Sequence, residues 1–178
     1  MIVLERGPYT LPNRDITLDW DVDLDLSVKR IYHICGENGL GKTSFLEQVL
    51  VPALRRHQVH YLFLGQDMGT QLYTLRASLA VVGHGLGNLP ETELLKLWVR
   101  QGSQARVFVL DEFDKYYPDH DFIFQASRAF IDTYVFVSHQ QEVCTLDAMP
   151  EYELRRITFE RTSLPHQTKR VHASMAAS

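Results

Sequence analysis

The chain has 178 residues, 45% of them hydrophobic, which is the size of one domain with enough apolar side chains for a core. Its formal net charge of −4 gives no support to nucleic-acid binding, because proteins that grip a phosphate backbone usually carry a basic surface. No stretch approaches the roughly 18 uncharged apolar residues of a membrane span. Residues 1–7 are too short and polar for a signal peptide, and Cys35 and Cys144 indicate neither a disulfide framework nor a zinc site, so we expect a cytoplasmic protein.

The first expected elements are strands. Residues 1–9 predict a strand that ends near Gly7-Pro8. Residues 15–27 alternate over most of their length, which predicts a half-buried strand, bent or broken once. Its apolar face consists of Ile16, Leu18, Trp20, Val22, Leu24 and Leu26. The aspartates on the other face do not indicate a calcium site, because same-face neighbours along a strand lie about 7 Å apart and do not converge on one ion.

A phosphate-binding P-loop follows the next predicted strand. Residues 30–35 predict a buried strand, and residues 45–50 have helix character. Between them lies a match to the pattern G-x-x-x-x-G-K-[ST], namely Gly36, Glu37, Asn38, Gly39, Leu40, Gly41, Lys42, Thr43 and Ser44. Backbone N–H groups of such a loop surround phosphate oxygens, Lys42 can reach the outer phosphates, and the Thr43 hydroxyl can ligate magnesium. A chance match in a glycine-rich turn is the alternative, but the flanking strand and helix favour the phosphate site.

The remaining elements follow in chain order. Pro52 is expected to kink or restart the helix after the P-loop. Next come a strand over 59–64 ending at Gly65-Gln66, a helix over 72–82, a glycine-rich turn over 83–88 and a helix over 90–102. They are followed by a strand over 106–110 leading into Asp111-Glu112, a helix over 121–131, a strand over 134–138 leading into His139, a strand over 153–162 and a flexible tail over 163–178. No apolar strand feeds residues 83–88, so we interpret them as a loop and not as a second phosphate site.

Alternating strands and helices predict an α/β fold: a P-loop NTPase with a mainly parallel central sheet flanked by helices and with antiparallel strands near the N-terminus. In such sheets, ligands bind at the carboxyl ends of the strands. Four positions follow the ends of predicted strands: Gly36, Gln66, Asp111 and His139. We therefore expect them to converge on the nucleotide.

The strand that ends at Asp111-Glu112 fits the Walker B pattern, in which an apolar strand delivers an acid to a metal ion. Asp111 is expected to hold Mg²⁺, and Glu112 to act as general base toward the attacking water. An isolated acidic pair could be a simple strand end, but a P-loop with 69 residues from Lys42 to Asp111 favours Walker B. A lone histidine is most often structural, whereas the place of His139 after the next strand predicts a role near the γ-phosphate. No guanine-reading Asn/Thr-Lys-x-Asp motif is present, which favours ATP over GTP.

Together these motifs resemble the ATP-binding cassette (ABC) ATPases over roughly residues 1–162. Gly65-Gln66 looks like the Q-loop of that family, Val-Leu-Asp-Glu looks like its Walker B with the catalytic glutamate, and Phe-Val-Ser-His looks like its switch histidine. The resemblance implies catalytic roles for Glu112, His139 and Gln66, and Mg²⁺ ligation by Thr43, Gln66 and Asp111. It also implies an aromatic side chain that stacks on adenine, for which Tyr9 is the better candidate because Trp20 lies on an apolar face.

The sequence departs from this family in its helical segment. No Leu-Ser-Gly-Gly-Gln signature occurs between Gln66 and Asp111, and the nearest segment by position is Leu-Pro-Glu-Thr-Glu over 89–93. Two acids there would repel phosphate, so a standard sandwich of two ATP molecules is not expected. The helical insertion, about residues 67–102, is also reduced. Residues 113–119 replace the usual Pro-Thr-Ser, with Asp119 as a weak substitute for the D-loop aspartate.

The resemblance therefore predicts a divergent ATPase subunit that works with an unidentified protein partner or second subunit, with a membrane partner possible. An AAA-type ATPase is the first alternative, because Asp-Glu-Phe-Asp-Lys over 111–115 resembles that family's Asp-Glu-x-Asp-Lys. That family needs a C-terminal helical lid, where this sequence predicts a strand. A P-loop kinase would need a lid or acceptor segment that does not stand out. A non-hydrolysing nucleotide switch or scaffold would have no need of Glu112.

Overall fold

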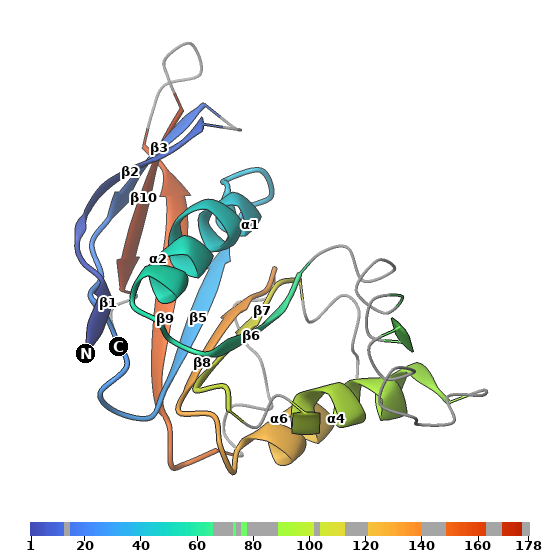
Figure 1. Cartoon of the computed structure of the whole chain (residues 1–178). Coiled ribbons are helices and arrows are strands. Elements are labelled where there is room, and N and C mark those ends of the chain that lie inside the picture. The colour runs from blue at the N-terminus through green and yellow to red at the C-terminus, as the bar shows by residue number, and fades with distance from the viewer. Residues whose placement is uncertain are drawn as a thin grey trace.

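An eight-stranded, mainly parallel sheet forms the centre of the described part of the molecule (Figure 1). The computed structural model of the chain describes residues 1–12, 15–65, 73, 76–77, 89–101, 104–112, 121–139, 149–162 and 169–175. In spatial order the strands are β2 (Gly7–Leu11), β3 (Ile16–Trp20), β10 (Lys169–Met175), β9 (Glu153–Arg161), β5 (Arg30–Gly36), β8 (Thr133–Val137), β7 (Val107–Leu110) and β6 (Tyr61–Leu64). From β9 to β6 all neighbours are parallel, whereas β10 is antiparallel to β9 and β2 is antiparallel to β3.

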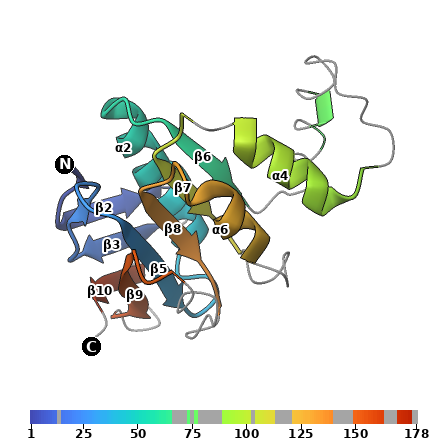
Figure 2. The ribbon, with the colours of Figure 1, turned by 90° about the horizontal axis from the view of Figure 1, so that it is seen from below.

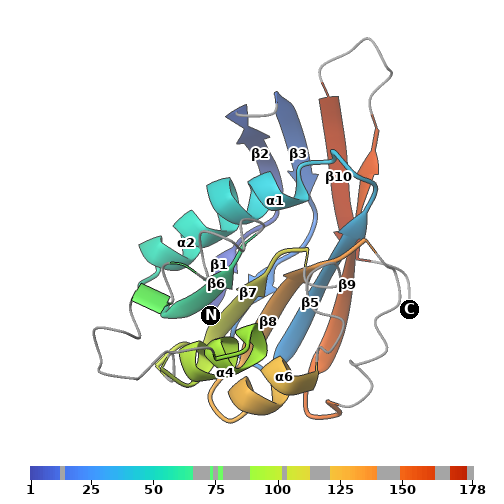
Figure 3. The ribbon, with the colours of Figure 1, turned by 90° about the vertical axis from the view of Figure 1, so that its right-hand side faces the viewer.

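Helices cover both faces of this sheet, as alternate residues of β7 demonstrate. Val107 and Val109 belong to a core that includes side chains of α1 (Lys42–Phe45) and α2 (Val51–Arg56). Phe108 and Leu110 belong to a second core with side chains of α4 (Glu91–Gln101) and α6 (Asp121–Ser127). Figures 2 and 3 show these two groups of helices well apart. The arrangement explains why the strands read as continuous apolar runs, since parallel strands in such folds are buried on both sides.

The helix after the P-loop continues past Pro52 through a widened turn. A π-helical turn, η2 (Leu46–Leu50), joins α1 to α2, and the Val51 N–H donates to the Leu46 carbonyl. Pro52 has no N–H and so cannot donate a regular i→i−4 bond. The expected irregularity is therefore present, as a π-turn directly before the proline.

The N-terminal strands are each divided once. The expected strand over 1–9 forms β1 (Ile2–Leu4) and part of β2, and the alternating segment over 15–27 forms β3 and β4 (Leu24–Asp25). β1 and β4 pair antiparallel in a separate two-stranded sheet. The predicted apolar face is confirmed: five of its six side chains, from Ile16 to Leu24, are buried in the same core, and Leu26 packs against it.

The structure differs from two expectations. The flexible tail predicted over 163–178 contains β10, which lies between β3 and β9, with Val171 and Ala173 fully buried. In β10 the two buried residues alternate with Arg170, His172 and Ser174. Two buried positions make a weak local strand pattern, so pairing with the distant strands on either side determines that this segment is a strand. The helix expected over 121–131 is also shorter and ends at Ser127. The predicted helix over 72–82 and turn over 83–88 lie mostly or wholly outside the described residues. No helix among the described residues is long and apolar enough to cross a membrane.

Candidate functional site

The P-loop joins the carboxyl end of β5 to α1, and its backbone requires glycine at two positions. Gly36 has φ +141°, and a Cβ there would lie 2.6 Å from the Phe159 carbonyl oxygen of the neighbouring strand β9. Gly41 has φ +86°, and a Cβ there would meet the Leu11 and Ile16 side chains at 3.0 Å. The motif glycines therefore allow the loop to pack against the sheet before the helix starts. Within the loop, Leu40 is buried, and Glu37, Asn38 and Gly39 are exposed.

Lys42 is folded back over this loop. Its side chain is almost buried, and Nζ donates to the Gly36 carbonyl at 2.7 Å and to the Glu37 carbonyl at 2.8 Å. Phe45 N donates to Gly41 O at 2.8 Å, which starts α1 directly after the loop. Thr43 is partly buried and Ser44 is buried in the same first turn. The loop thus holds a positive charge beside the N-terminus of the P-loop helix, where anions are favoured.

Asp111 is a buried carboxylate at the end of β7. Its backbone N–H donates to Leu64 O at 2.8 Å, which fixes the residue beside the end of β6. Only 3% of Asp111 is exposed, and neither carboxylate oxygen has a well-formed hydrogen bond among the described residues, although the Thr43 hydroxyl and the Glu112 N–H lie close to the carboxyl group. Burial raises the pKa of Asp111 to about 6, and Glu112 adds to the rise; the nearby Thr43 hydroxyl opposes it. Burial of a carboxylate costs free energy of folding unless a cation or a hydrogen-bond donor binds its oxygens.

Glu112 and His139 meet across the ends of β7 and β8. Glu112 adopts a left-handed backbone with φ 44°, which costs a non-glycine residue about 1–3 kcal/mol. Its carboxylate Oε1 lies 3.6 Å from His139 Nε2, and the Glu112 side chain is 12% exposed. The strained backbone therefore presents a largely desolvated acid to an imidazole at the same sheet edge as the P-loop. Among the described residues, the P-loop, the Asp111-Glu112 pair and His139 follow the carboxyl ends of β5, β7 and β8, which are parallel neighbours in the order β5, β8, β7, and the Thr43 hydroxyl lies close enough to Asp111 to lower its pKa.

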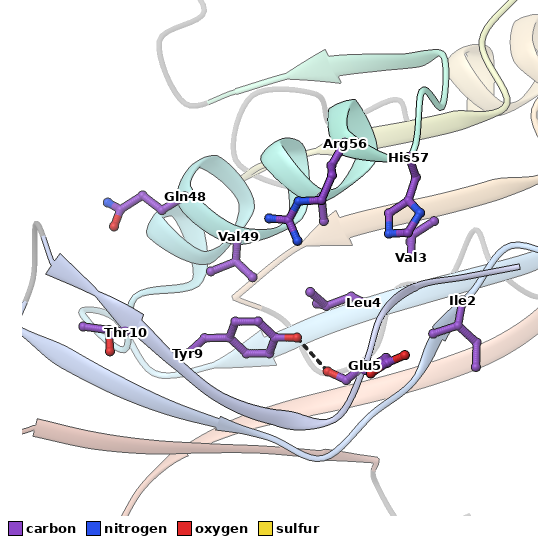
Figure 4. A pocket seen from close by; sticks show the side chains of 11 residues that line it. Ile2, Val3, Leu4, Glu5, Tyr9, Thr10, Gln48, Val49, Arg56 and His57 are labelled. Atoms are coloured by element: carbon purple, nitrogen blue, oxygen red, sulfur yellow. Dashed lines mark hydrogen bonds between the residues drawn. The ribbon is translucent and has the colours of Figure 1, made fainter.

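Two predicted site residues do not join this group in the described structure. Gln66 lies outside the described residues. Tyr9 lies on β2 beneath the π-turn, and its hydroxyl donates to Glu5 O at 2.8 Å (Figure 4). It lines a cavity of about 460 Å³ between the N-terminal strands and the helix, formed by Ile2, Val3, Leu4, Glu5, Tyr9, Thr10, Gln48, Val49, Ala53, Arg56 and His57. No P-loop residue lines this cavity, so stacking of Tyr9 on adenine stays a prediction.

A buried polar pair next to the site was not singled out by the sequence. His33 of β5 and Ser138 after β8 are both buried, with His33 Nε2 2.7 Å from Ser138 Oγ. The available signal was a histidine within an otherwise apolar strand. It became informative only when the strand order placed β8 beside β5.

Comparisons with known proteins identify the fold. No protein-family model matches the chain, and no curated protein matches it. Similar solved structures include a KaiC-like protein from Pyrococcus horikoshii, with a TM-score of 0.50, 8% identity, and coverage of 83% of this chain and 79% of that chain. The flagellar accessory protein FlaH from Methanocaldococcus jannaschii gives a TM-score of 0.51 and 13% identity, over 83% of this chain and 78% of that chain.

At these identities the likeness is one of fold alone. The sheet order and the P-loop at the end of β5 together define the class: the chain has a P-loop NTPase fold with a mainly parallel central sheet. The comparisons do not distinguish the ABC type from other members of this class.

Proposed function

We propose that the chain is a magnesium-dependent ATPase of ABC type that turns over slowly alone and works with a protein partner in the cytoplasm. The observation that carries the proposal is the convergence of three strand ends, which bring the P-loop, Asp111-Glu112 and His139 to one edge of the sheet. They supply a cation, a buried carboxylate and an acid–imidazole pair. Phosphoryl transfer needs these groups for charge neutralisation, metal binding and orientation of the nucleophile.

The P-loop would bind the triphosphate of ATP. Backbone N–H groups between Gly36 and Ser44 would donate to phosphate oxygens at the N-terminus of α1. Lys42 Nζ, which donates to the Gly36 and Glu37 carbonyls, would exchange them for outer phosphate oxygens. The ammonium therefore stays paired in either state, which lowers the cost of keeping a nearly buried lysine charged.

Thr43 and Asp111 would hold Mg²⁺, with Gln66 as a further predicted ligand. The fit rests on the two buried oxygens of Asp111, which have no well-formed hydrogen bond among the described residues, and on the Thr43 hydroxyl close to them. Magnesium binds proteins through one or two carboxylates and keeps several waters. When bound, Mg²⁺ would neutralise charge on the β- and γ-phosphates.

Glu112 would act as the general base. It would accept a proton from the attacking water as the water oxygen bonds to the γ-phosphorus and the bond to the β,γ-bridging oxygen breaks. The products are ADP and phosphate. A side chain that is 12% exposed can meet a single water while staying largely desolvated. His139 would contact the γ-phosphate. It would also orient the Glu112 carboxylate, because His139 Nε2 lies 3.6 Å from Glu112 Oε1.

Two groups of strands favour the ABC type over the AAA type: those before the P-loop strand β5, and β9 and β10 after residue 149. Among the described residues, four strands, β1 to β4, precede the P-loop strand β5 and pair antiparallel as β1 with β4 and β2 with β3, in keeping with the antiparallel strands of the ABC pattern. An AAA-type protein would carry a helical lid where the described residues of this chain form the strands β9 (Glu153–Arg161) and β10 (Lys169–Met175).

A partner is proposed because the signature motif is missing. Residues 89 and 90 precede α4, residues 91–93 form its first turn, and Glu93 pairs with Lys96 at 2.8 Å. Carboxylates at this position would repel a γ-phosphate in a partly desolvated interface. Another protein must therefore complete the site, or it stays open to water.

Phosphate release tests the proposed activity. Glu112→Gln should retain ATP binding and lose roughly 10²–10⁴ in rate, as expected for removal of a general base. Glu151→Gln, an exposed acid in the turn before β9, is the matched control and should keep the wild-type rate. Wild-type turnover in Glu112→Gln would refute the assignment. ATP binding by the wild type without any turnover would favour the switch or scaffold.

Light scattering tests the partner requirement. Glu112→Gln should stay monomeric with Mg·ATP, because the chain has no signature to close a symmetric dimer. A clean shift to dimer that is abolished by substitutions within 89–93 would show that an ordinary cassette mechanism operates. Affinity purification of Glu112→Gln with Mg·ATP would then identify the partner.

A further inference from the structure

A polar tie, formed by the hydrogen-bonded side chains of His33 and Ser138, connects the P-loop strand β5 to the segment that carries His139. β5 and β8 are parallel neighbours, with His33 opposite Phe136 and Ile34 opposite Val137. The ladder continues past β8, where Ser138 N donates to Ile34 O at 3.2 Å. The Ser138 hydroxyl lies 2.7 Å from His33 Nε2. Ser138 is thus held by two adjacent residues of β5, through its backbone and its side chain.

This tie is buried in an apolar setting. His33 is 0% exposed and Ser138 is 1% exposed. The His33 ring stacks on Phe136 with centroids 4.7 Å apart and planes 14° apart. An apolar side chain would fill such a place without a desolvation cost, whereas a buried polar pair must keep its hydrogen bond. Buried pairs of this kind fix one geometry, because every alternative leaves a polar group unpaired.

The tie sits one residue away from the proposed reaction centre. His139 follows Ser138 directly, and its Nε2 lies 3.6 Å from Glu112 Oε1. Gly36, the first residue of the P-loop, lies three residues after His33 on the same strand. A displacement of Ser138 relative to β5 would therefore move His139 relative to the bound phosphates, and small misplacements of reacting groups carry large losses of rate.

We propose that His33 is a positioning residue, which acts through Ser138 to fix His139 relative to the P-loop and Glu112. This inference rests on the proposed ATPase function for its kinetic consequence. The geometry of His139 beside Glu112 can be measured without turnover.

The proposal is tested by measuring ATP hydrolysis in variants of the two buried residues. His33→Phe keeps an aromatic ring on Phe136 and removes the hydrogen bond, and Ser138→Ala removes the other partner. Each should lower kcat roughly tenfold, and the double variant should be no worse than either single one, because both changes break the same tie. Affinity for Mg·ATP should change less than about twofold, since Lys42 and Thr43 are untouched. His33→Gln, which places an amide near the Nε2 position, should recover much of kcat.

Tyr134→Phe is the matched control for lost stability. Tyr134 is fully buried on β8, and its hydroxyl lies 2.6 Å from Ser127 Oγ, so the variant also loses a buried hydrogen bond. It should lower the melting temperature and leave kcat near the wild-type value. Losses of kcat in His33→Phe and Ser138→Ala that merely equal the loss in Tyr134→Phe, or that add in the double variant, would overturn the proposal.

An NMR readout separates this inference from the proposed function. In protein labelled at histidine, Glu112→Gln should shift the His139 ring signal, because the two side chains are 3.6 Å apart. That response should fall by about half or more in the His33→Phe background, as expected for coupled residues. An unchanged response would refute a positioning role even if the wild type hydrolyses ATP. A reduced response would support it even if hydrolysis is absent.

Discussion

Replacement of Asp111 by asparagine is expected to stabilise the nucleotide-free protein at alkaline pH, although it removes a proposed Mg²⁺ ligand. Burial raises the pKa of Asp111 from 3.8 to about 6. The folded state therefore holds the proton more tightly than the unfolded state. Well below pH 3.8 the Asp111 carboxyl group is protonated in both states and does not affect the free energy of unfolding. Between pH 3.8 and about pH 6 the carboxyl group ionises in the unfolded state before it ionises in the folded state, so the free energy of unfolding of the wild type falls. Above about pH 6 the loss is complete and amounts to about 3 kcal/mol.

The assay is urea denaturation of the wild type and Asp111→Asn at pH 4 and pH 8, in the presence of a chelator. The two proteins should have similar free energies of unfolding at pH 4. At pH 8 Asp111→Asn should be more stable by about 1–3 kcal/mol, less than the full value because the buried amide also needs partners. Asp15→Asn is the control, since Asp15 is exposed and asparagine tolerates its left-handed backbone at φ 49°. The same stability difference at both pH values, or a less stable Asp111→Asn at pH 8, would refute the reasoning.

Two further predictions concern the sheet around the site. Gly36→Ala should lower the free energy of unfolding by about 1–3 kcal/mol or prevent folding, because the added Cβ would lie 2.6 Å from the Phe159 carbonyl oxygen. An unchanged free energy of unfolding, measured by chemical denaturation, would contradict the observed packing. Truncation after Thr162 should lower the melting temperature by about 10 °C or more, since it removes β10 with the buried Val171 and Ala173; a circular dichroism melt like that of the full chain would show that β10 is dispensable.

The sequence predicted the parallel part of the fold well because its signals are local. Strands buried on both faces appear as short apolar runs, and each of β5, β6, β7 and β8 lies within one or two residues of its expected position. The P-loop and the Asp111-Glu112 pair are contiguous motifs, so their positions needed no knowledge of strand order. Proximity of Glu112 to His139 followed from a general rule about strand ends in parallel sheets.

Features that depend on distant pairing were missed. β10 has a weak local pattern and is a strand because β3 and β9 flank it. The bond between His33 and Ser138 joins residues 105 positions apart, so only the order of strands could reveal it. The left-handed backbone of Glu112 is a departure from local preference of the kind that proteins retain at functional sites.

A calorimetric titration of Mg·ATP into the wild type and Lys42→Ala tests the central claim most directly. Lys42 Nζ sits within the P-loop, 2.7 Å from Gly36 O, where it can transfer to the outer phosphates. The wild type should bind ATP at one site, and Lys42→Ala should bind at least about tenfold more weakly, a loss of about 1.4 kcal/mol. Equal affinity in the two proteins, or no binding by the folded wild type, would contradict the assignment of this loop as the nucleotide site.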